Sequence, residues 1–316
     1  MQKDSKIFVA GSRGLVGSAL VRKLRTEGYI NILTSTKTQL NLIEQASVNK
    51  YFEVNKPEYV FHLAAKVGGI VGNKTYPADF LYDNVLINTH VLGMAHKYGV
   101  KKLLNFGSVC IYPVHAEIPI REDTLLTGPL EYTNEAYAIA KIAGLMLAKK
   151  YKEQYGDNFI SVMPANLYGI NDNFHPQNAH VIPMIMRRFH EAKLNGDKQV
   201  TVWGTGKPTR DFLNSKDVAT GLLFLMLNYD GLEHINIGPG YETSIKELAE
   251  TMKEVVGFEG ELVFDTSKPD GTPRRYLDTS KMKALGWEAK VDLKQGLTET
   301  YEWFEQNYDI LKEKYK

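Results

Sequence analysis

The chain has 316 residues, of which 43% are hydrophobic and 24% are charged, a composition that predicts a folded protein of about two domains and excludes a mainly disordered one. Its 38 lysines and arginines nearly balance its 37 aspartates and glutamates, so we expect no nucleic-acid partner. The single cysteine excludes an internal disulfide and a multi-cysteine metal site. Since no run of 18 apolar residues occurs either, we expect a cytoplasmic protein with no metal site and no membrane contact.

In chain order, the first half alternates short apolar runs with stretches in which apolar residues recur at helical spacing. The predicted strands span 7–10, 30–34, 59–63, 102–106 and 159–163. The predicted helices span 15–27, 43–54, 77–99 and 134–155. This repeated β–α–β order predicts an α/β fold with a doubly wound parallel Rossmann sheet that helices cover on both faces.

Beyond Pro164 the order of elements becomes irregular, and loops rich in Asn, Gly and Pro separate shorter helices. Such loops carry recognition chemistry more often than regular elements do. We therefore predict a cofactor-binding Rossmann domain over residues 1–164, with a segment near 211–242 returning to it. Residues 165–210 and 243–316 are predicted to form a smaller α/β substrate-binding lobe.

A glycine-rich turn joins the first predicted strand to the first predicted helix. Its glycines are spaced GxxGxxG, which lets the backbone turn tightly and approach a pyrophosphate at a helix N-terminus. Because the turn lies between a strand and a helix, we interpret it as a dinucleotide-binding turn rather than a surface turn. The predicted cofactor-binding residues here are Gly11, Ser12, Arg13, Gly14, Leu15, Val16 and Gly17.

The residues after the second predicted strand indicate which nicotinamide cofactor is bound. Proteins that bind NAD usually place an acidic residue there, about 20 residues past the glycines, to hold the ribose 2′-hydroxyl. Segment 34–38 has hydroxyls and Lys37 but no carboxylate, and Arg13 adds a second positive charge. Because these charges would attract a 2′-phosphate, the sequence predicts NADP(H).

Tyr137 and Lys141 lie four residues apart in a predicted helix, so their side chains share one face. A free tyrosine has a pKa of about 10, and a neighbouring ammonium would lower it, so that the phenol could exchange a proton with a carbonyl. Ser108 follows the fourth predicted strand, at the sheet edge where ligands bind. These three residues are a candidate catalytic Ser–Tyr–Lys set, which resembles that of the extended short-chain dehydrogenase/reductase superfamily.

Cys110 and His180 are the other candidate catalytic residues. If the segment after the fourth strand stays extended, Ser108 and Cys110 face the same way, and a thiol near cations is a competent base. A buried structural cysteine fits the position equally well. His180 precedes an amphipathic stretch in the second half of the chain, and its side chain is suited to proton transfer near neutral pH.

Longer motifs narrow the resemblance. From Ile7 to about Phe304, the chain resembles the GDP-L-fucose synthase family. The motifs that carry this resemblance are SxCIYP, YAIAKIAG, NFHPxNxHVIP and SKPDGTPR. The resemblance implies a two-step, NADPH-dependent conversion of GDP-4-keto-6-deoxy-D-mannose to GDP-L-fucose, by 3,5-epimerisation and then reduction of the 4-keto group.

The resemblance also assigns catalytic roles. Cys110 would remove the protons on C3 and C5, which the C4 ketone makes acidic, and His180 would return protons on the opposite face. Tyr137, assisted by Lys141 and Ser108, would protonate the C4 oxygen during hydride transfer. One ketone would thus serve both steps.

By the same resemblance, further residues would bind ligands. The cofactor would be lined by Phe106, Gly107, Ser108, Val109, Lys141, Pro164, Ala165, Asn166, Leu167 and His180. The GDP-sugar would be held by Arg188, Trp203, Arg210 and Asp270. The helices over 77–99 and 134–155 would pair across a homodimer. Val109 and Ala136 depart from the residues commonest in the family, as does Lys37, which stands where arginine is common and leaves a weaker NADP preference open.

Other activities stay open at this point. An NAD-dependent nucleotide-sugar 4-epimerase of the same superfamily would retain its cofactor and show no net oxidation. A 4,6-dehydratase would need a carboxylate near the catalytic serine, which residues 109–111 do not supply. A cofactor-sensing regulatory protein without turnover would have no reason to keep the Ser–Tyr–Lys set together.

Overall fold

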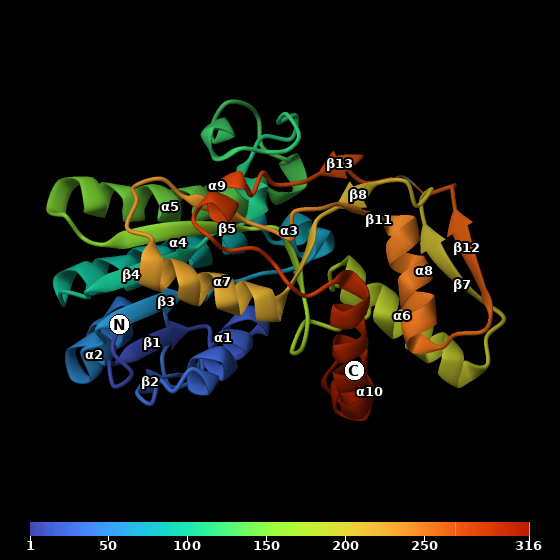
Figure 1. Cartoon of the computed structure of the whole chain (residues 1–316), viewed down its shortest axis with the longest axis horizontal. Helices are drawn as coiled ribbons and strands as arrows, with labels where there is room; N and C mark the ends of the chain where they lie inside the picture. The colour runs from blue at the N-terminus through green and yellow to red at the C-terminus, as the bar shows by residue number, and fades with distance from the viewer. Residues whose placement is uncertain (269, 316) are drawn as a thin grey trace.

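The computed structural model describes residues 1–268 and 270–315, and at its centre lies a six-stranded, wholly parallel sheet. The strand order is β2-β1-β3-β4-β5-β10 (Figure 1). The bounds are β1 Ile7–Ala10, β2 Ile32–Leu33, β3 Tyr59–His62, β4 Lys102–Phe106, β5 Phe159–Pro164 and β10 Ile235–Ile237. The doubly wound parallel α/β fold that the sequence predicts is confirmed.

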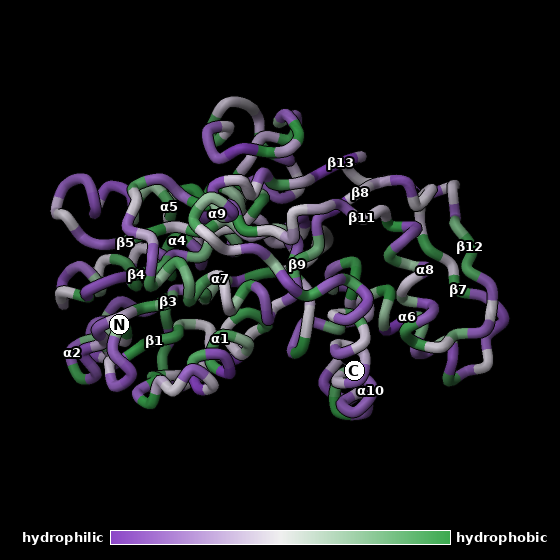
Figure 2. Tube along the Cα trace, in the orientation of Figure 1, coloured by the Kyte–Doolittle hydropathy of each residue, from purple (hydrophilic) through white to green (hydrophobic). Residues whose placement is uncertain are grey.

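The central strands form where the sequence is almost continuously apolar, because a parallel sheet is covered on both faces. Every residue of β1 and β4 is buried, and Figure 2 shows hydrophobic residues along β1 and β3. The predicted strand over 30–34 shrinks to Ile32–Leu33. It lies at the edge of the sheet, where only one neighbour pairs with it.

Helices cover both faces of the sheet. On one face, α1 (Leu15–Thr26) packs against α7 (Ser215–Asn228). On the other, α4 (Pro77–Lys97) packs between α2 (Gln45–Asn55) and α5 (Glu135–Tyr155). The sheet edge at the carboxyl ends of the strands is left for the loops.

A short helix that the sequence did not predict precedes α4. This helix, α3, spans Ile70–Thr75, and Tyr76 separates it from α4 with φ −126° and ψ 49°. Pro77 then occupies the first helical turn of α4, where its fixed φ and missing N–H cost nothing. The proline therefore begins a new helix in place of one continuous element.

The direction of the strand order reverses at β1. From β1 the chain moves outward to β2 and then returns to the other side of β1 at β3. The crossovers after β1 and β3 therefore leave in opposite directions, which opens a crevice at the carboxyl ends of these two strands. This is the place where open α/β sheets bind ligands.

A second group of elements packs beside the sheet around its own apolar core (Figure 1). Three helices supply most of this core: α6 (Val181–Asn195), α8 (Ile245–Val256) and α10 (Leu293–Lys314). Short elements lie around this core: β6 Asn166–Tyr168, β7 Gln199–Trp203, β8 Thr209–Arg210, β9 Phe212–Asn214, β11 Thr243–Ser244, β12 Glu261–Asp265 and β13 Arg274–Arg275. The helix α9 (Ser280–Ala284) packs instead against β10, and its Met282 belongs to the core beside the sheet. Within the described residues, no helix is both long and apolar enough to cross a membrane.

Candidate active site

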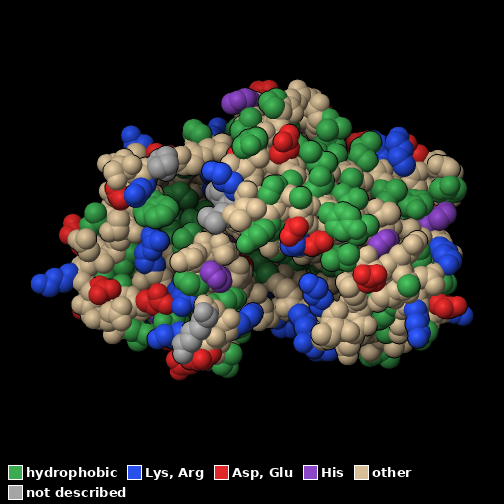
Figure 3. All heavy atoms as spheres, turned by 180° about the vertical axis from the view of Figure 1, so that it is seen from behind, with side chains coloured by type: hydrophobic (Ala, Val, Ile, Leu, Met, Phe, Trp, Pro, Cys, Tyr) green, Lys and Arg blue, Asp and Glu red, His purple; other side chains and the backbone are tan. Residues whose placement is uncertain are grey.

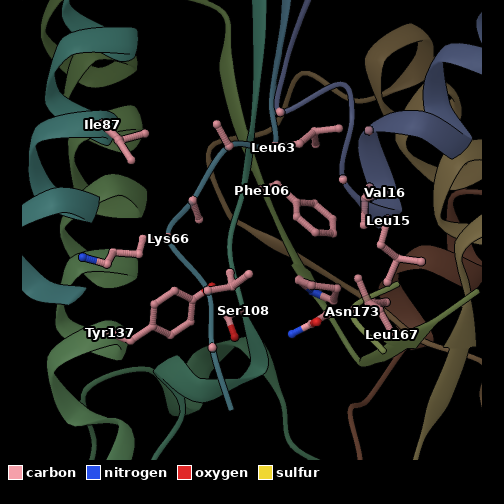
Figure 4. Close-up of a pocket in the computed structure, with 18 of the residues that line it drawn as sticks. Leu15, Val16, Leu63, Lys66, Ile87, Phe106, Ser108, Tyr137, Leu167 and Asn173 are labelled. Atoms are coloured by element: carbon pink, nitrogen blue, oxygen red, sulfur yellow. The ribbon is translucent and has the colours of Figure 1, made fainter. Parts of the chain in front are cut away.

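A cavity of about 970 Å³ opens at the carboxyl ends of the central strands. Its walls come from the turn after β1, the segments after β3 and β4, the first turns of α5, the end of β5 and the loop before α6. Figure 4 shows Ser108 and Tyr137 on one side of this space, with Leu15, Leu167 and Asn173 on the other. The cavity thus occupies the crevice that the strand order creates.

The turn after β1 presents bare backbone to this cavity. Gly11 has φ +83°, and a Cβ there would lie 2.9 Å from the Ala64 nitrogen. A Cβ on Gly17 would lie 2.1 Å from the Gly11 oxygen, so only glycine fits both positions. Gly14 is the N-cap of α1 and has no side chain to bond the free amides of the first turn. These amides can therefore hold a pyrophosphate.

Nearly all the predicted cofactor residues line the cavity. They are Gly11, Arg13, Gly14, Leu15, Val16, Gly17, Lys37, Phe106, Gly107, Ser108, Val109, Lys141, Pro164, Ala165, Asn166, Leu167 and His180. Ser12 differs: its side chain is buried without a hydrogen-bond partner for the hydroxyl and lies outside the described lining. Ser35 and Thr36, which the sequence analysis left out, also line the cavity beside Lys37. Their hydroxyls and the two exposed cations fit the 2′-phosphate of NADP.

The segment after β4 carries Ser108 and Cys110 into the cavity on a tight turn. Residues Val109–Ile111 form a 3-10 helix, and the Cys110 backbone N–H donates to the Ser108 Oγ at 3.3 Å. The expectation of an extended segment is therefore wrong. Both side chains nevertheless line the cavity, because the turn is tight enough to keep them on one side.

Arg275 of β13 fixes this turn from outside. Its Nη2 donates to the carbonyl oxygens of Val109, at 2.8 Å, and Tyr112, at 3.1 Å. A planar guanidinium with several donors can bridge two carbonyls in this way. A residue distant in sequence thereby holds the backbone that carries the thiol.

Tyr137 and Lys141 share one face of α5, as their spacing predicts. The Lys141 Nζ lies 5.8 Å from the centre of the Tyr137 ring and donates to the Phe106 carbonyl oxygen at 2.8 Å. Asn88 of α4 donates to the Ala140 carbonyl oxygen at 2.9 Å. A Cβ on Gly144 would come within 2.7 Å of Asn88. The glycine lets α4 and α5 approach closely and so positions the two catalytic candidates.

The protein environment changes the titration of both groups. Burial, and then the charge of Cys110, raises the pKa of Tyr137, and a hydrogen bond with Ser108 only partly offsets this. Burial lowers the pKa of Lys141 to about 8, against an opposing effect of Cys110. The expected lowering of the Tyr137 pKa is therefore wrong, since burial is the largest effect on this phenol. A phenol that stays protonated can donate its proton to a substrate oxygen.

His180 is the N-cap residue of α6 and lines the same cavity. Its ring is reached by solvent there, while surrounding protein atoms lower the pKa of His180 through desolvation. The imidazole is therefore mainly neutral near pH 7. The structure thus brings all five predicted catalytic residues to one cavity. They are Ser108, Cys110, Tyr137, Lys141 and His180.

The loop before α6 contributes residues that the sequence analysis missed. Asp172, Asn173 and Asn178 line the cavity. Burial raises the pKa of Asp172 to about 7, and its Oδ2 atom is buried without a hydrogen-bond partner. The sequence shows many polar residues here, in NDNFHPQN. The motif used for the resemblance begins at Asn173, so it did not single out Asp172.

The predicted substrate residues lie outside the catalytic cavity. Arg188 and Trp203 line a second hollow of about 360 Å³, where the Arg188 Nη1 donates to the Thr201 carbonyl oxygen at 2.6 Å. The Asp270 carboxylate accepts from Thr205, from its N–H at 2.8 Å and its Oγ1 at 2.7 Å. Burial lowers the pKa of Arg210. The structure does not place these four residues beside the catalytic set.

No group of three or more His, Cys, Asp or Glu side chains suited to a metal ion occurs in residues 1–268 and 270–315. The cavity instead contains a glycine turn at a helix N-terminus, a tyrosine and a lysine on one helix face, and a free thiol. With the parallel sheet, these features define a dinucleotide-binding protein of the short-chain dehydrogenase/reductase class.

Comparison with known proteins agrees with this class. The model of the NAD dependent epimerase/dehydratase family matches residues 7–238, and the chain belongs to this family. It is 57% identical to GDP-L-fucose synthase 1 of Arabidopsis thaliana, over 96% of this chain and 94% of the relative. It is 48% identical to GDP-L-fucose synthase of Escherichia coli K12, over 96% of this chain and 98% of the relative.

A solved structure has the same architecture. The crystal structure of a GDP-L-fucose synthetase from Naegleria fowleri bound to NADP is 35% identical and superimposes with a TM-score of 0.90. The match covers 98% of this chain and 96% of that one. The similarity therefore extends to the second group of elements as well as the sheet.

Proposed function

We propose that this protein converts GDP-4-keto-6-deoxy-D-mannose to GDP-L-fucose, by 3,5-epimerisation and then NADPH-dependent reduction of the 4-keto group. The observation that carries the proposal is that one cavity holds both the Ser–Tyr–Lys set and a second pair of proton-transfer groups, Cys110 and His180. Ketone reduction needs only the first set, whereas inversion at two carbons needs groups that remove and return protons. The names of the relatives agree with this activity.

The proposed cofactor site runs along the first two βα units. The amides of the turn Gly11–Gly17 would hold the pyrophosphate, and Arg13 and Lys37 would pair with the 2′-phosphate. Lys141 would bind the ribose hydroxyls, since its ammonium lies at the cavity wall. Bound NADPH supplies the hydride that reduces C4.

Epimerisation is assigned to Cys110 and His180. The thiolate of Cys110 takes a proton from C3 or C5, forming an S–H bond while the C–H electron pair moves into an enolate stabilised by the C4 ketone. A proton is then returned to the opposite face of the carbon by His180. Because the His180 ring is mainly neutral near pH 7, it must gain a proton before it acts as the acid, and its solvent access permits this.

Reduction is assigned to Tyr137. Its phenol gives its proton to the C4 oxygen while hydride arrives at C4, so the carbonyl becomes a hydroxyl and the phenol becomes a phenolate. Ser108 hydrogen-bonds the same oxygen and holds the ketone in place. Lys141 stabilises the phenolate after the transfer, since its Nζ lies 5.8 Å from the ring centre.

The GDP portion is assigned to the second group of elements. Arg188, Trp203, Arg210 and Asp270 would hold it, because guanidinium groups pair with a diphosphate and an indole that is 65% exposed can stack on a base. We propose that residues 165–210 and 243–316 form this substrate lobe. Residues 1–164 form the cofactor domain, together with a returning segment near 211–242 that contains α7 and β10.

A homodimer through α4 and α5 completes the proposal. These helices carry large apolar side chains toward solvent, with Tyr82 64% exposed and Ile139 43% exposed. Figure 3 shows apolar side chains gathered on the face seen from behind. A second copy that presents the same helices would cover them. Light scattering tests this, since wild-type protein should have the mass of a dimer and Ile139→Glu that of a monomer.

A cytoplasmic location is also proposed, because the mechanism needs Cys110 as a reduced thiol.

The proposed reaction is tested by mixing purified protein with GDP-4-keto-6-deoxy-D-mannose and NADPH and following the absorbance of reduced nicotinamide. The expected result is one NADPH oxidised for each GDP-L-fucose formed. An NAD-dependent nucleotide-sugar 4-epimerase would recycle its hydride within one turnover. No net oxidation of NADPH would therefore overturn the proposal.

A further inference from the structure

The side-chain amide of Asn134 contacts the Cys110 sulfur from the protein side of the cavity wall. The Asn134 Nδ2 lies 2.7 Å from the Cys110 Sγ, and it is the donor of this contact. Cys110 belongs to the cavity lining, whereas Asn134 lies outside its described members. One side of the sulfur is therefore held by an amide while another side faces the ligand space.

The Asn134 side chain contacts the sulfur and does not cap its helix. Asn134 is the N-cap residue of α5, a position where asparagine side chains usually bond the free amides of the first helical turn. Here no side-chain bond caps the helix, and the Asn134 Oδ1 is buried without a partner. A buried amide oxygen without a hydrogen bond is unfavourable and uncommon. The hydrogen bond from the Asn134 Nδ2 to the Cys110 sulfur accounts for this orientation of the amide.

Local hydrogen bonds fix both partners. Asn134 closes the 3-10 turn Tyr132–Asn134, and its N–H donates to the Glu131 carbonyl oxygen at 3.0 Å. The Glu131 carboxylate accepts from the N–H and hydroxyl of Thr133. On the other side, the Cys110 N–H is bonded to Ser108. The backbone of both residues is therefore held by local hydrogen bonds.

The charged and titratable groups around the sulfur come from several elements. On α5, burial and then the charge of Cys110 raise the pKa of Tyr137, while burial lowers the pKa of Lys141 against an opposing effect of Cys110. The guanidinium of Arg275, on β13, binds the carbonyl oxygens of the turn that carries the thiol. His180 lines the cavity from the loop before α6. Asn134 differs from these in having a donor that does not titrate.

A hydrogen bond donated to an ionised group favours that ionised form. We propose that Asn134 is a positioning residue for epimerisation: its Nδ2–H stabilises the Cys110 thiolate and holds the sulfur at the cavity wall. The inference rests on the proposed function, in which this sulfur removes the C3 and C5 protons. The amide itself touches neither substrate nor cofactor, so it acts through Cys110.

The test replaces Asn134 with an isosteric side chain that cannot donate. Asn134→Asp keeps a good N-cap residue for α5 but puts a carboxylate beside the sulfur, and Asn134→Ala removes the contact without adding charge. Because Cys110 is the one cysteine in the sequence, iodoacetamide consumption reports its ionisation in the NADP-bound protein. The matched control is Asn228→Ala, an exposed asparagine at the end of α7.

We expect the pH midpoint of alkylation to move upward by about one unit in Asn134→Ala and further in Asn134→Asp, because the thiolate loses its donor. Deuterium incorporation at C3 and C5 should fall about tenfold at pH 7, with little change in KM, while Asn228→Ala matches wild type. An Asn134→Ala protein that retains the wild-type alkylation profile would overturn the proposal, since a purely structural role would leave the profile unmoved.

Two failures are distinguishable. If wild-type protein does not convert the keto sugar but the alkylation midpoint still moves in the variants, the proposed function fails and the contact with the thiolate stands. If wild-type protein is active and the midpoint stays unmoved in both Asn134 variants, the positioning role alone is wrong.

Discussion

The cofactor side and the substrate side of this molecule are built in different ways. On the cofactor side, contacts come from one glycine turn and from the ends of neighbouring parallel strands, which meet at a single sheet edge. On the substrate side, the four predicted residues come from separate elements: Arg188 from helix α6, Trp203 from β7, Arg210 from β8 and Asp270 from the loop after β12. Two of these four line their own hollow, apart from the catalytic cavity.

This difference shows which kinds of site can be recognised from spacing. A parallel sheet brings its carboxyl ends together whatever the sequence distance between strands, so a motif at a strand end can be assigned to the site at once. The loops of the second group of elements follow no such rule. Their predicted ligand contacts rest on a resemblance. If the two sides differ in function as they differ in construction, substitutions on each side should change different kinetic constants.

The largest effects are expected from two substitutions in the shared cavity, each removing a different step. Cys110→Ser should slow deuterium incorporation at C3 and C5 by 10²–10⁴-fold, the usual contribution of a general base. Tyr137→Phe should leave this incorporation near the wild-type rate and slow NADPH oxidation by a similar factor. Mass spectrometry of the sugar and nicotinamide absorbance give both rates, and each variant is the other's control. Wild-type exchange in Cys110→Ser would exclude the thiol as base.

The turn after β4 shows how far the sequence could predict this site. The sequence analysis placed Ser108 and Cys110 together by assuming an extended segment, whereas the structure brings them together through a 3-10 turn. Alternation of side chains was therefore the wrong reason for a correct pairing. Tyr137 and Lys141 needed only the regular spacing of a helix, which is local and robust.

Other parts of the site were beyond the reach of pattern. Asn134 looks like an ordinary helix cap in the sequence, and its contact with the sulfur depends on how α5 packs against the turn after β4. Asp172 is notable because it is buried without a partner for one oxygen, a property that no spacing reveals. The start of α3 and the shortening of β2 likewise depend on neighbouring elements.

Substitutions on the substrate side should change binding more than chemistry. Arg188→Ala and Trp203→Ala are each expected to raise the KM for the GDP-sugar by about 10- to 100-fold with kcat little changed, because they would remove contacts made equally in the ground and transition states. Steady-state kinetics at saturating NADPH measure this. Arg121→Ala, an exposed arginine paired with Asp123, is the matched control. A fall in kcat with an unchanged KM would contradict a binding role.

The charge of Lys37 offers a smaller and more selective change. Lys37→Glu should raise the KM for NADPH by about tenfold while that for NADH changes little, since one charged hydrogen bond to a phosphate contributes about 1.5–3 kcal/mol. Lys50→Glu makes the same charge change on α2, away from the cavity lining. If both cofactors weaken equally, Lys37 does not distinguish the 2′-phosphate.

A separate prediction concerns the stability of the cofactor-free protein and leaves the reaction aside. Because the pKa of Asp172 is raised from 3.8 to about 7 in the folded state, the folded protein binds this proton more tightly than the unfolded chain. Its contribution to stability is therefore complete below about pH 4 and is lost as pH rises to about 7. Asp172→Asn should become more stable relative to wild type across this window, by up to about 4 kcal/mol, since each unit of pKa difference corresponds to about 1.4 kcal/mol.

Urea unfolding at pH 4, 5.5 and 7 measures this trend. Asp309→Asn, which changes an exposed aspartate of α10, should keep a constant difference from wild type. A constant difference for Asp172→Asn as well would show that its carboxyl does not titrate between the two states as its burial implies.

The account depends most on one sugar ketone being within reach of both the thiol and the phenol. The direct measurement is a crystal structure of the Tyr137→Phe protein with NADPH and GDP-4-keto-6-deoxy-D-mannose. It should show the C4 oxygen at hydrogen-bond distance from the Ser108 hydroxyl and the Cys110 sulfur directed at the hydrogens of C3 or C5. A ketone bound where the sulfur faces away from both carbons would contradict the shared site.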